Sequence, residues 1–415
     1  MSKILIHTIA FSPDGVSTAY LYNDIALKFK EEGYEVTVLT TTPHYNLVRE
    51  DLKRQPLKFN LLGLYFESNY KGIKVKHIPQ KKFKSSILRM FGFIYWHFAS
   101  FILGLFENNI DIILSPSPPL TLGLVNIFLG KLKGAKVIYN VQEIYPDLLI
   151  ENGGLKSKGI ISILKKLESF VYNYSDKVTT IDKVFYDTIV SRFKDESKLE
   201  IIPNFVDTAI YKPLTLDTTT IDRNYFPNTD SFKLMYAGNI GHAQDWETLV
   251  KIAIELRDDN IDFYIIGEGV QKDFLCREIS KYSLEKVHLI PYQNRELMPA
   301  LIAYSDLQFI FMSPETEGHG FPSKVYTIMA CAKPMIVSSG KNTPIINFLE
   351  NRHCAFLIEE SNLSKKTDRI VEILKATSNS ELVEMGNKGL ADVKLNYSKD
   401  AVVEKYINLV NSLII

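Results

Sequence analysis

The amino-terminal half of the chain alternates short apolar runs with longer stretches of helical periodicity. The run at residues 4–8 is followed by a loop and then by residues 17–31, where apolar side chains recur with the spacing of one helix face. Gly33 follows this stretch and is expected to end the helix. Further strands are expected at residues 35–40, 73–78, 111–114, 136–140, 177–181 and 199–202, and further helices at residues 85–106 and 120–132. Strands that alternate with helices of this length predict a parallel, doubly wound α/β sheet.

The same alternation restarts after residues 203–207, which we interpret as a hinge. Six more strands are expected, at residues 233–237, 263–266, 287–290, 306–311, 335–338 and 355–358. Glycine-rich turns follow the first two of them, and open α/β sheets bind ligands at the carboxyl ends of their strands. A chain of 415 residues is also too long for one compact core. We therefore predict two Rossmann-like domains facing a cleft, at residues 1–203 and 204–395, with a helix at residues 396–415 that packs back toward the first domain.

The stretch at residues 41–71 interrupts this pattern, because it shows no clear periodicity. Loops of such length in a compact domain are usually functional or mobile. Its lysines, arginines and aromatic residues fit a flap that faces an acceptor or a membrane. A surface loop without defined structure fits the same composition equally well.

Composition excludes some classes of protein. Lys and Arg (48 together) balance Asp and Glu (48 together), so no excess positive charge is available for a general nucleic-acid binder. The three cysteines, Cys276, Cys331 and Cys354, lie far apart without metal-ligand spacing, and such sparse usage fits a reducing cytoplasm. Met1 leads directly into a strand-like run, so no secretory signal is expected.

The segment at residues 85–106 is long, apolar and rich in aromatic residues, and it follows the basic cluster Lys81, Lys82 and Lys84. Its length reaches the transmembrane range of about 17–25 residues. A membrane span would put strands of one sheet on opposite sides of the bilayer, so we expect instead a helix at the membrane surface. Residues 81–106 are therefore predicted to attach a cytoplasmic protein peripherally to the inner membrane face. An ordinary apolar helix packed on the sheet is the alternative.

The most informative segment for chemistry runs from residue 317 to residue 330. Pro322 and Ser323 stand where a helix is expected to begin, with Ser323 as its N-cap. Backbone N–H groups there, together with the positive end of the helix dipole, form a site for a diphosphate. Lys324 adds a full positive charge at this end of the helix, which is unfavourable unless an anion is bound. A solvated lysine without a ligand is the alternative.

A second glycine-bearing turn, residues 238–241 (GNIG), lies between an expected strand and an expected helix. Glycines in such a turn let the backbone approach a pyrophosphate, although a tight turn without a ligand is also consistent. The spacing is not the G-x-G-x-x-G fingerprint, so we infer no nicotinamide cofactor. Gly15, in the first strand–helix loop of the amino-terminal domain, is expected to face the same cleft.

Glu143 follows the strand expected at residues 136–140 and is predicted to project into the cleft from the acceptor side. Its carboxylate is suited to accept the proton of an attacking hydroxyl or to orient the acceptor. A helix-start carboxylate or a surface ion pair is the alternative. Residues 115–119 (SPSPP) end another strand at this edge and are interpreted as a rigid wall of the acceptor pocket. No His, Cys, Asp or Glu residues have convincing metal-ligand spacing, so no metal is expected.

Five segments together resemble one enzyme family. They are PDGVST at residues 13–18, GYEVTVLT at 33–40, IPNFVD at 202–207, YAGNIG at 236–241 and PSKVYTIMA at 322–330. With them, the whole chain resembles the retaining GT-B glycosyltransferases of the family 4-like group, which includes sucrose synthases and many bacterial polysaccharide enzymes. It is most similar to the branch that makes O-antigen and capsule repeat units and that includes the L-fucosamine transferase WbuB.

The resemblance implies a UDP-sugar donor, retention of the anomeric configuration, and no required metal or other cofactor. His319 and Thr327 fall at the positions of two family glutamates, separated by seven residues, that contact the donor sugar and the ribose. Because neither residue is a glutamate, His319 is expected on the donor sugar or phosphate, Thr327 on a ribose hydroxyl, and Glu317 is a candidate for the missing carboxylate. Asn239 replaces a family arginine, which leaves Lys324 as the main cation for the diphosphate.

By the same resemblance, the loops at residues 267–269 and 291–293 match those that hold the nucleotide base. The catalytic residues are therefore expected to be Glu143, Lys324 and His319. The residues expected to bind the donor are Gly15, Gly238, Asn239, Gly241, Gly267, Tyr292, Glu317, Gly320, Phe321, Pro322, Ser323 and Thr327.

These inferences predict a glycosyltransferase that moves a sugar, an N-acetylated or deoxy hexosamine, from a UDP-sugar to a polyprenyl-diphosphate-linked saccharide. The product would belong to an O-antigen, a capsule or a related envelope polysaccharide. A UDP-N-acetylglucosamine 2-epimerase-like isomerase shares the architecture, but it has no use for a membrane-facing segment. A non-catalytic nucleotide-sugar-binding subunit is the third reading, because the two family glutamates are missing.

Overall fold

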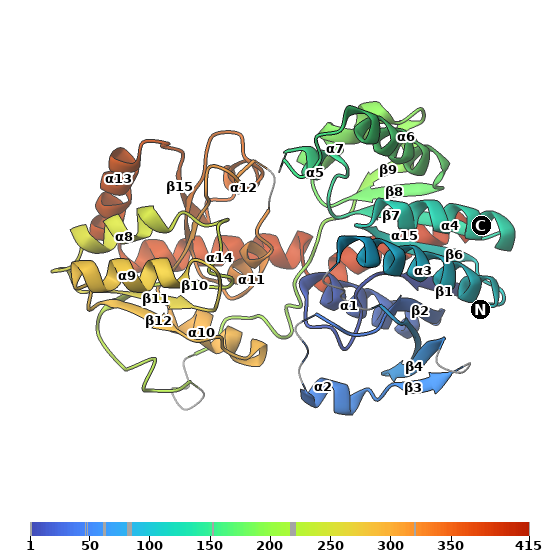
Figure 1. Cartoon of the computed structure of the whole chain (residues 1–415). Helices are drawn as coiled ribbons and strands as arrows, with labels where there is room; N and C mark the ends of the chain where they lie inside the picture. Colours follow the sequence, from blue (N-terminus) through green and yellow to red (C-terminus); the bar gives the residue numbers. More distant parts are fainter. Residues whose placement is uncertain are drawn as a thin grey trace. The chain divides into compact units, whose positions relative to one another are not determined.

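A computed structural model describes residues 2–45, 47, 49–60, 64–80, 85–151, 153–215, 221–318 and 321–414. The chain forms two compact units (Figure 1). Unit 1 comprises Met1–Asn204 together with Val402–Ile415, and unit 2 comprises Phe205–Ala401. The sequence placed the corresponding boundaries after residues 203 and 395.

Unit 1 is built on a nine-stranded sheet with the order β3-β4-β5-β2-β1-β6-β7-β8-β9. The strands are β1 (Lys3–His7), β2 (Glu35–Thr41), β3 (Lys58–Asn60), β4 (Tyr65–Tyr70), β5 (Ile73–Ile78), β6 (Ile112–Ser117), β7 (Lys136–Val141), β8 (Lys177–Thr180) and β9 (Leu199–Ile201). All neighbours pair in parallel except β3 with β4 and β4 with β5. From β1 the chain builds outward first through β2 and then, on the other side, through β6. The sheet therefore has a topological switch point between β1 and β6, where α/β sheets bind ligands.

Residues 41–71 are more regular than the sequence predicted. They contain α2 (Arg49–Arg54) and the short strands β3 and β4, which extend the sheet of unit 1. β4 and β5 form a hairpin whose two turn residues, Lys71 and Gly72, have φ values of 48° and 84°. Positive φ at both central residues is the geometry that matches the twist of a two-residue hairpin. The expectation of a long irregular loop is therefore wrong for the described part of this stretch.

Helices cover both faces of this sheet and bury its apolar strands. They are α1 (Ser17–Glu31), α3 (Ser86–Leu105), α4 (Leu120–Lys133), α5 (Asp147–Glu151), α6 (Lys158–Tyr174), α7 (Lys183–Ile189) and α15 (Lys399–Ile414). α4 packs between α3 and α6. The carboxy-terminal helix α15 belongs to unit 1 from Val402 onward, and Tyr34 donates a hydrogen bond to Asn411 over 2.5 Å. Helices on a mostly parallel sheet give the predicted doubly wound class.

The aromatic helix α3 is only half packed. Trp96 and Ser100 are fully buried against the unit, whereas Phe91 and Phe98 are 58 % and 66 % exposed. Among the described helices, the stretch from Leu88 to Leu105 is long and apolar enough to cross a membrane, and 22 % of it is buried. A core helix would be mostly buried, whereas in the described part of the chain one apolar face of this helix is exposed. The basic residues Lys81, Lys82 and Lys84 lie outside the described residues.

Unit 2 contains a parallel six-stranded sheet with the order β12-β11-β10-β13-β14-β15. Its strands are β10 (Phe232–Ala237), β11 (Ile261–Ile266), β12 (Val287–Ile290), β13 (Leu307–Phe311), β14 (Met335–Ser338) and β15 (Ala355–Ile358). Its helices are α8 (Trp246–Glu255), α9 (Lys272–Tyr282), α10 (Met298–Tyr304), α11 (Lys324–Ala330), α12 (Pro344–Leu349), α13 (Leu363–Ala376) and α14 (Asn379–Asn396). The switch point of this sheet lies between β10 and β13.

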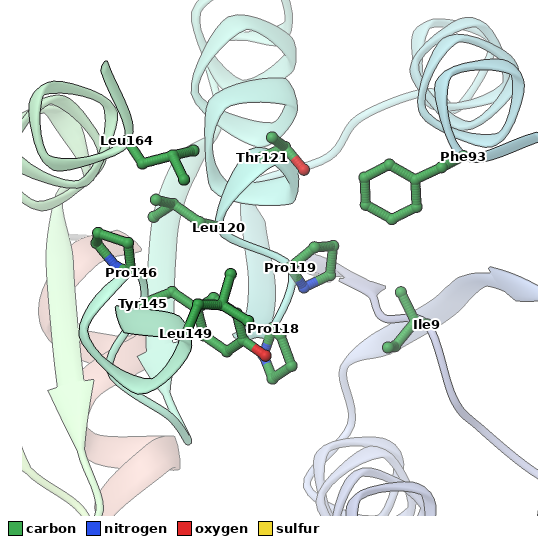
Figure 2. Close-up of a pocket in the computed structure, with 10 residues that line it drawn as sticks. All are labelled: Ile9, Phe93, Pro118, Pro119, Leu120, Thr121, Tyr145, Pro146, Leu149 and Leu164. Atoms are coloured by element: carbon green, nitrogen blue, oxygen red, sulfur yellow. The ribbon is translucent and has the colours of Figure 1, made fainter. Parts of the chain in front are cut away.

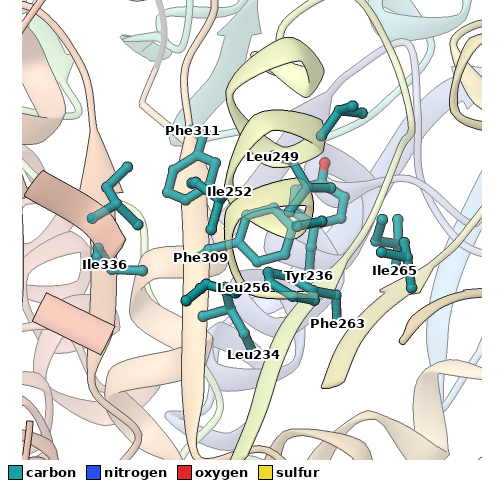
Figure 3. Close-up of a cluster of buried hydrophobic side chains, with 14 of the residues drawn as sticks. Leu234, Tyr236, Leu249, Ile252, Leu256, Phe263, Ile265, Phe309, Phe311 and Ile336 are labelled. Atoms are coloured by element: carbon teal, nitrogen blue, oxygen red, sulfur yellow. The ribbon is translucent and has the colours of Figure 1, made fainter. Parts of the chain in front are cut away.

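The core of unit 2 joins the sheet to α8. Leu234, Tyr236 and Phe309 of the strands pack against Leu249 and Ile252 of this helix (Figure 3). Each buried side chain of this size contributes about 1.5–3 kcal/mol relative to an exposed one. At the start of α8, the carboxylate of its N-cap Asp245 accepts the N–H of Thr248 over 3.0 Å, which satisfies one free helix donor. This packing fixes the carboxyl ends of β10 and β13, where the candidate site lies.

Candidate functional site

Lys324 lies beside the glycine turn that follows β10. Its ammonium nitrogen is 3.6 Å from the centre of the Tyr236 ring, and a Cβ at Gly238 would lie 2.7 Å from this nitrogen. The Tyr236 hydroxyl donates to the carbonyl of Asn239 over 2.7 Å. The same side chain therefore stabilises the turn through its hydroxyl and contacts Lys324 through its ring. In the part of the chain that the structure describes, no carboxylate pairs with Lys324. The structure thus joins Lys324 and the 238–241 turn, which the sequence identified separately.

The environment of Lys324 favours a bound anion. The side chain is half-buried, and burial lowers its pKa from 10.5 to about 7. Cation–π contact with Tyr236 is attractive but does not replace a counter-ion. A cation that has lost water without gaining an anion is stabilised when a phosphate arrives. Gly238 and Asn239, which lie beside it, are exposed, so the turn is open to solvent next to the lysine.

Close backbone packing explains the glycines of two neighbouring turns. Gly238 has φ of 152° and Gly267 has φ of 144°, a region that side chains disfavour. A Cβ at Gly267 would lie 1.9 Å from the carbonyl oxygen of Gly238, and a Cβ at Gly269 would lie 2.2 Å from that of Ile240. The Ile240 N–H donates to the backbone carbonyl of Glu268 over 2.9 Å. The turn after β11 therefore supports the turn after β10 from behind.

A Gly267→Ala variant is expected to lower the free energy of unfolding by about 1–3 kcal/mol, because its Cβ meets a backbone oxygen and its φ becomes strained. Gly159→Ala is the control, since Gly159 lies in the first turn of α6 with open space around its Cβ position. Urea unfolding of both variants provides the measurement. An unchanged free energy of unfolding in Gly267→Ala would contradict the close packing of the two turns, because it would show that the turns can move apart to accommodate a side chain.

The residues around the start of α11 contact one another, but Ser323 does not cap the helix as the sequence predicted. Ser323 occupies the N-cap position, but its backbone is αR and its hydroxyl makes no capping hydrogen bond, so the predicted capping role is wrong. The carbonyl of Pro322 instead accepts the N–H of Val325 over 3.0 Å. Phe321 packs against Tyr326, with ring centres 5.3 Å apart. The exposed Ser323 hydroxyl is therefore free of the helix.

Glu317 is committed to a neighbouring loop. Its Oε2 accepts the N–H of Gly340 over 2.6 Å and the Ser339 hydroxyl over 3.3 Å. Both partners follow β14, so this carboxylate ties the loop before α11 to the end of the next strand. The sequence offered it as a replacement for a missing donor-binding glutamate, and these bonds give it a structural role. Thr327 lies on the half-exposed side of α11, one turn after Lys324.

The remaining predicted donor residues of unit 2 differ in exposure. Tyr292 follows β12 and is 67 % exposed, and the Gly267 N–H donates to Ile290 at the end of that strand over 3.0 Å. The carbonyl of Gly241 accepts the Trp246 indole N–H over 2.9 Å, which fixes the far end of the turn. Tyr292 and Gly267 thus belong to adjacent strand ends. His319 and Gly320 lie outside the described residues.

In unit 1, the loop after β1 is held by a carboxylate that the sequence did not single out. Asp14 is 2 % exposed, and its Oδ1 accepts the N–H groups of His44 and Tyr45 over 2.8 and 2.7 Å. Burial raises the pKa of this carboxyl group, while these hydrogen bonds oppose the rise. The N–H of Gly15 donates to the Tyr45 carbonyl over 2.9 Å. Gly15 is therefore part of a braced loop, with Asp14 as its anchor.

Glu143 lies after β7, close to the end of β6. The Ser117 hydroxyl donates to the backbone carbonyl of Glu143 over 2.9 Å, which joins the two strand ends. The Tyr145 hydroxyl donates to the Glu143 carboxylate. Burial raises the pKa of Glu143, and the bond from Tyr145 partly opposes this rise. A half-buried carboxylate with a raised pKa has the properties of a general base or an orienting group.

The predicted residues thus form two groups, one in each unit. Unit 2 gathers Gly238, Asn239, Gly267 and Lys324, and unit 1 places Glu143 near the end of β6. Tyr236 and Tyr145 were missed, although each stands two residues from a predicted site residue. Over the described ranges, no three His, Cys, Asp or Glu side chains lie together as metal ligands.

Two parallel-sheet α/β units, each with candidate ligand residues at its switch point, define the class of two-domain GT-B enzymes. The family models described as "Glycosyltransferase Family 4" and "Glycosyl transferases group 1" match residues 19–210 and 217–389. The chain belongs to the GT-B glycosyltransferases and combines a family 4 domain with a group 1 domain.

Curated relatives agree with this assignment. The chain is 22 % identical to an Escherichia coli (strain K12) protein described as a colanic acid biosynthesis glycosyl transferase, WcaI, over 83 % of this chain and 84 % of the relative. It is 23 % identical to the Pseudomonas aeruginosa glycosyltransferase WbjE, over 73 % of this chain and 75 % of the relative. The specific likeness to WbuB stays a prediction.

Solved structures share the fold at low identity. Sucrose-phosphate synthase from Thermosynechococcus elongatus has a TM-score of 0.72 at 13 % identity, with 100 % of this chain and 99 % of that chain covered. Anabaena HepE in complex with UDP-glucose has a TM-score of 0.71 at 14 % identity, covering 99 % of this chain and 100 % of the other. These similarities establish the fold.

Proposed function

We propose that the protein transfers a sugar from a UDP-sugar to a polyprenyl-diphosphate-linked saccharide, with retention of configuration and without a required metal. The sugar is proposed to be an N-acetylated or deoxy hexosamine. The product belongs to an envelope polysaccharide such as O-antigen or capsule. Colanic acid synthesis in the name of the relative WcaI supports this product class, and the UDP-glucose bound to HepE supports the donor class.

The observation that carries the proposal is the position of Lys324. An ammonium group without a carboxylate partner among the described residues lies beside the exposed Gly238 turn at the switch point of the unit 2 sheet. A UDP leaving group gains negative charge as the glycosidic bond breaks. A positioned cation stabilises that charge most in the transition state, so it accelerates the bond cleavage. Thr327 and Tyr292 are proposed to contact the ribose and the base, and His319 the donor sugar or phosphate.

The acceptor is assigned to unit 1. A hydroxyl group of the acceptor attacks the anomeric carbon of the donor sugar on the same face from which UDP departs. Because attack and departure take place on one face, the anomeric configuration is retained. Either Glu143 or the departing phosphate oxygen takes the proton of this hydroxyl. The hydrogen bond from Tyr145 holds the Glu143 carboxylate in place for the first of these routes.

The proposal is tested by screening UDP-sugars for thermal stabilisation and then assaying the stabilising donor with lipid-diphosphate-linked saccharides in EDTA. A donor present at 100 times its Kd adds about 2.7 kcal/mol of stability. We expect transfer that EDTA does not reduce. Epimerisation of the donor without acceptor would point to the isomerase, and stable donor binding without turnover on any acceptor would point to a binding subunit.

The pKa of Lys324 predicts that UDP binding takes up a proton. Near pH 8 most of the free protein carries neutral Lys324, because its pKa is about 7. A diphosphate favours the charged form and raises this pKa, so binding must be accompanied by protonation and must weaken as the pH rises above 7. Calorimetry at pH 8 in two buffers of different ionisation enthalpy measures the uptake. Identical heats in both buffers would contradict the contact.

We also propose that α3 attaches unit 1 to the membrane surface. Its exposed apolar side chains include Phe91 and Phe98. A Phe91→Glu, Phe98→Glu variant is expected to bind anionic vesicles at least about tenfold more weakly in co-sedimentation, since two apolar anchors are lost. The control carries the same charge change at Val383 and Leu395, which are 62 % and 75 % exposed on α14 of unit 2. Equal loss in both variants would refute a specific role for α3.

A further inference from the structure

Unit 1 contains an open apolar pocket of about 350 Å³ (Figure 2), which we call the chain pocket. Its volume falls within the range of about 300–1,000 Å³ that is typical of small-molecule sites. Its lining residues come from the loops after three strands and from the four helices α3, α4, α5 and α6. All ten of these residues are labelled in Figure 2.

The chain pocket lies at the switch point of the sheet. Ile9 follows β1, Pro118 and Pro119 follow β6, and Tyr145 and Pro146 follow β7. The strands β1 and β6 are the two between which the direction of chain building reverses. Open α/β sheets bind their ligands at this point, outside the carboxyl ends of the strands. The pocket therefore occupies the position of a ligand site.

The chemistry of the lining selects a hydrocarbon. Eight of the ten side chains carry no polar atom, and no charged side chain is among them. The Thr121 hydroxyl is within 2.9 Å of His97 Nε2, and the Tyr145 hydroxyl donates to Glu143, so both polar groups are already engaged. A sugar or nucleotide in this pocket would lose the hydrogen bonds that its hydroxyl groups make with water and gain none, which is unfavourable. An apolar chain meets no such cost.

Two neighbours of the pocket indicate which apolar chain it holds. Tyr145 lines the pocket with its ring, and its hydroxyl donates a hydrogen bond to the Glu143 carboxylate. A molecule bound in the pocket therefore lies next to the candidate base. Phe93 belongs to α3, whose exposed Met90 and Ile94 continue the apolar surface away from the pocket. An occupant thus has one end near the reacting group and the other on an apolar helix face. A lipid held this close to the reacting group is a substrate.

We propose that the chain pocket binds the first isoprene units of the acceptor lipid, next to its diphosphate. This inference rests on the proposed function, because it assigns the lipid part of the acceptor to a site. The walls formed by Pro118 and Pro119 are rigid, since proline fixes its own φ, so the pocket is preorganised for the chain. Specificity for a lipid-linked acceptor then arises in unit 1 itself and does not require a bilayer.

The test measures binding of dimethylallyl, geranyl and farnesyl diphosphate and of inorganic diphosphate to the full-length protein by calorimetry. Each isoprene unit that enters the pocket is expected to tighten binding by at least about tenfold, because several carbon atoms leave water. Affinities that do not change with chain length would overturn the proposal. Displacement of farnesyl diphosphate by phosphatidylglycerol vesicles would assign the pocket to bilayer acyl chains and would also overturn it.

Matched variants locate the binding site. Leu164→Gln and Leu149→Gln place an amide in the pocket, and Ile163→Gln makes the same change at the adjacent residue of α6, which is 66 % exposed. Farnesyl diphosphate is expected to bind the two pocket variants at least about tenfold more weakly and Ile163→Gln as the wild type does. Leu149 is 36 % exposed on the short helix α5, so its variant retains the fold even if Leu164→Gln does not. Equal affinity of Leu149→Gln and the control would refute the assignment.

Failure of this inference is distinguishable from failure of the proposed function. If sugar is transferred to acceptors with short and long lipid chains at equal KM, lipid binding in the chain pocket is refuted, whereas the proposed glycosyltransferase activity is supported. If the isoprenyl diphosphates bind with an affinity that depends on chain length but no lipid-linked saccharide receives a sugar, lipid binding in the pocket is supported and the proposed reaction is refuted.

Discussion

A Lys324→Met variant is expected to lower kcat/KM for the UDP-sugar by about 10- to 150-fold. Methionine keeps the length and apolar stem of the side chain but removes the charge. A charge-assisted hydrogen bond to phosphate is worth roughly 1.5–3 kcal/mol, and each 1.4 kcal/mol corresponds to a factor of about ten. The loss is expected in kcat as well as in KM, because the charge of the leaving diphosphate is greatest in the transition state. Steady-state kinetics with varied donor concentration measures both constants.

The control for this variant is Lys251→Met, on the exposed face of α8 and away from the turn after β10. It makes the same chemical change and is expected to leave kcat/KM unchanged. Undiminished transfer by Lys324→Met would remove the main residue of the proposed site. The fold of unit 2 is expected to tolerate the change, since in the described chain Lys324 makes no ion pair that methionine would break.

A Glu143→Gln variant is expected to lower kcat by about 100-fold or more if its carboxylate takes the proton of the acceptor hydroxyl. Glutamine keeps the shape of the side chain and its hydrogen-bonding reach. A role in orienting the acceptor would instead raise KM for the acceptor with a smaller change in kcat. An unchanged kcat and KM would assign proton removal to the departing phosphate.

The pH–rate profile separates these roles further. A base acts when it is deprotonated, so the rate must rise with pH through the pKa of Glu143, which burial raises. Tyr145→Phe removes a hydrogen bond that lowers this pKa, and the acid limb of the profile must then move to higher pH. The limb should disappear in Glu143→Gln. A limb that stays in place in both variants would belong to another group.

The doubly wound fold was predictable because burial on both faces makes parallel strands short apolar runs. The strands β5, β12, β14 and β15 have the predicted limits, and β1 is shifted by one residue from the run at residues 4–8. The short strands β3 and β4 were missed because they lie at the sheet edge and mix polar with aromatic residues, so their periodicity is weak. The pair Lys71-Gly72 was a signal for their hairpin, although lysine is a less common turn residue than asparagine or aspartate.

The candidate site was predictable as far as it depends on local sequence. Lys324 was identified because it places a positive charge at the start of a helix, and the turn at residues 238–241 because it lies between a strand and a helix. The contact between them depends on tertiary packing, through a Tyr236 ring that no local pattern assigns to the site. The hydrogen bond from the Gly340 N–H to the Glu317 carboxylate also depends on tertiary packing, because it joins residues of two different loops. The chain pocket likewise forms only where three strand ends and four helices meet.

The most direct test of the account is a crystal structure of the protein with UDP bound. We predict that an oxygen of the diphosphate lies within hydrogen-bonding distance, about 3 Å, of Lys324 Nζ, beside Gly238. UDP bound elsewhere on unit 2, with Lys324 still resting on the Tyr236 ring and no phosphate contact, would contradict it.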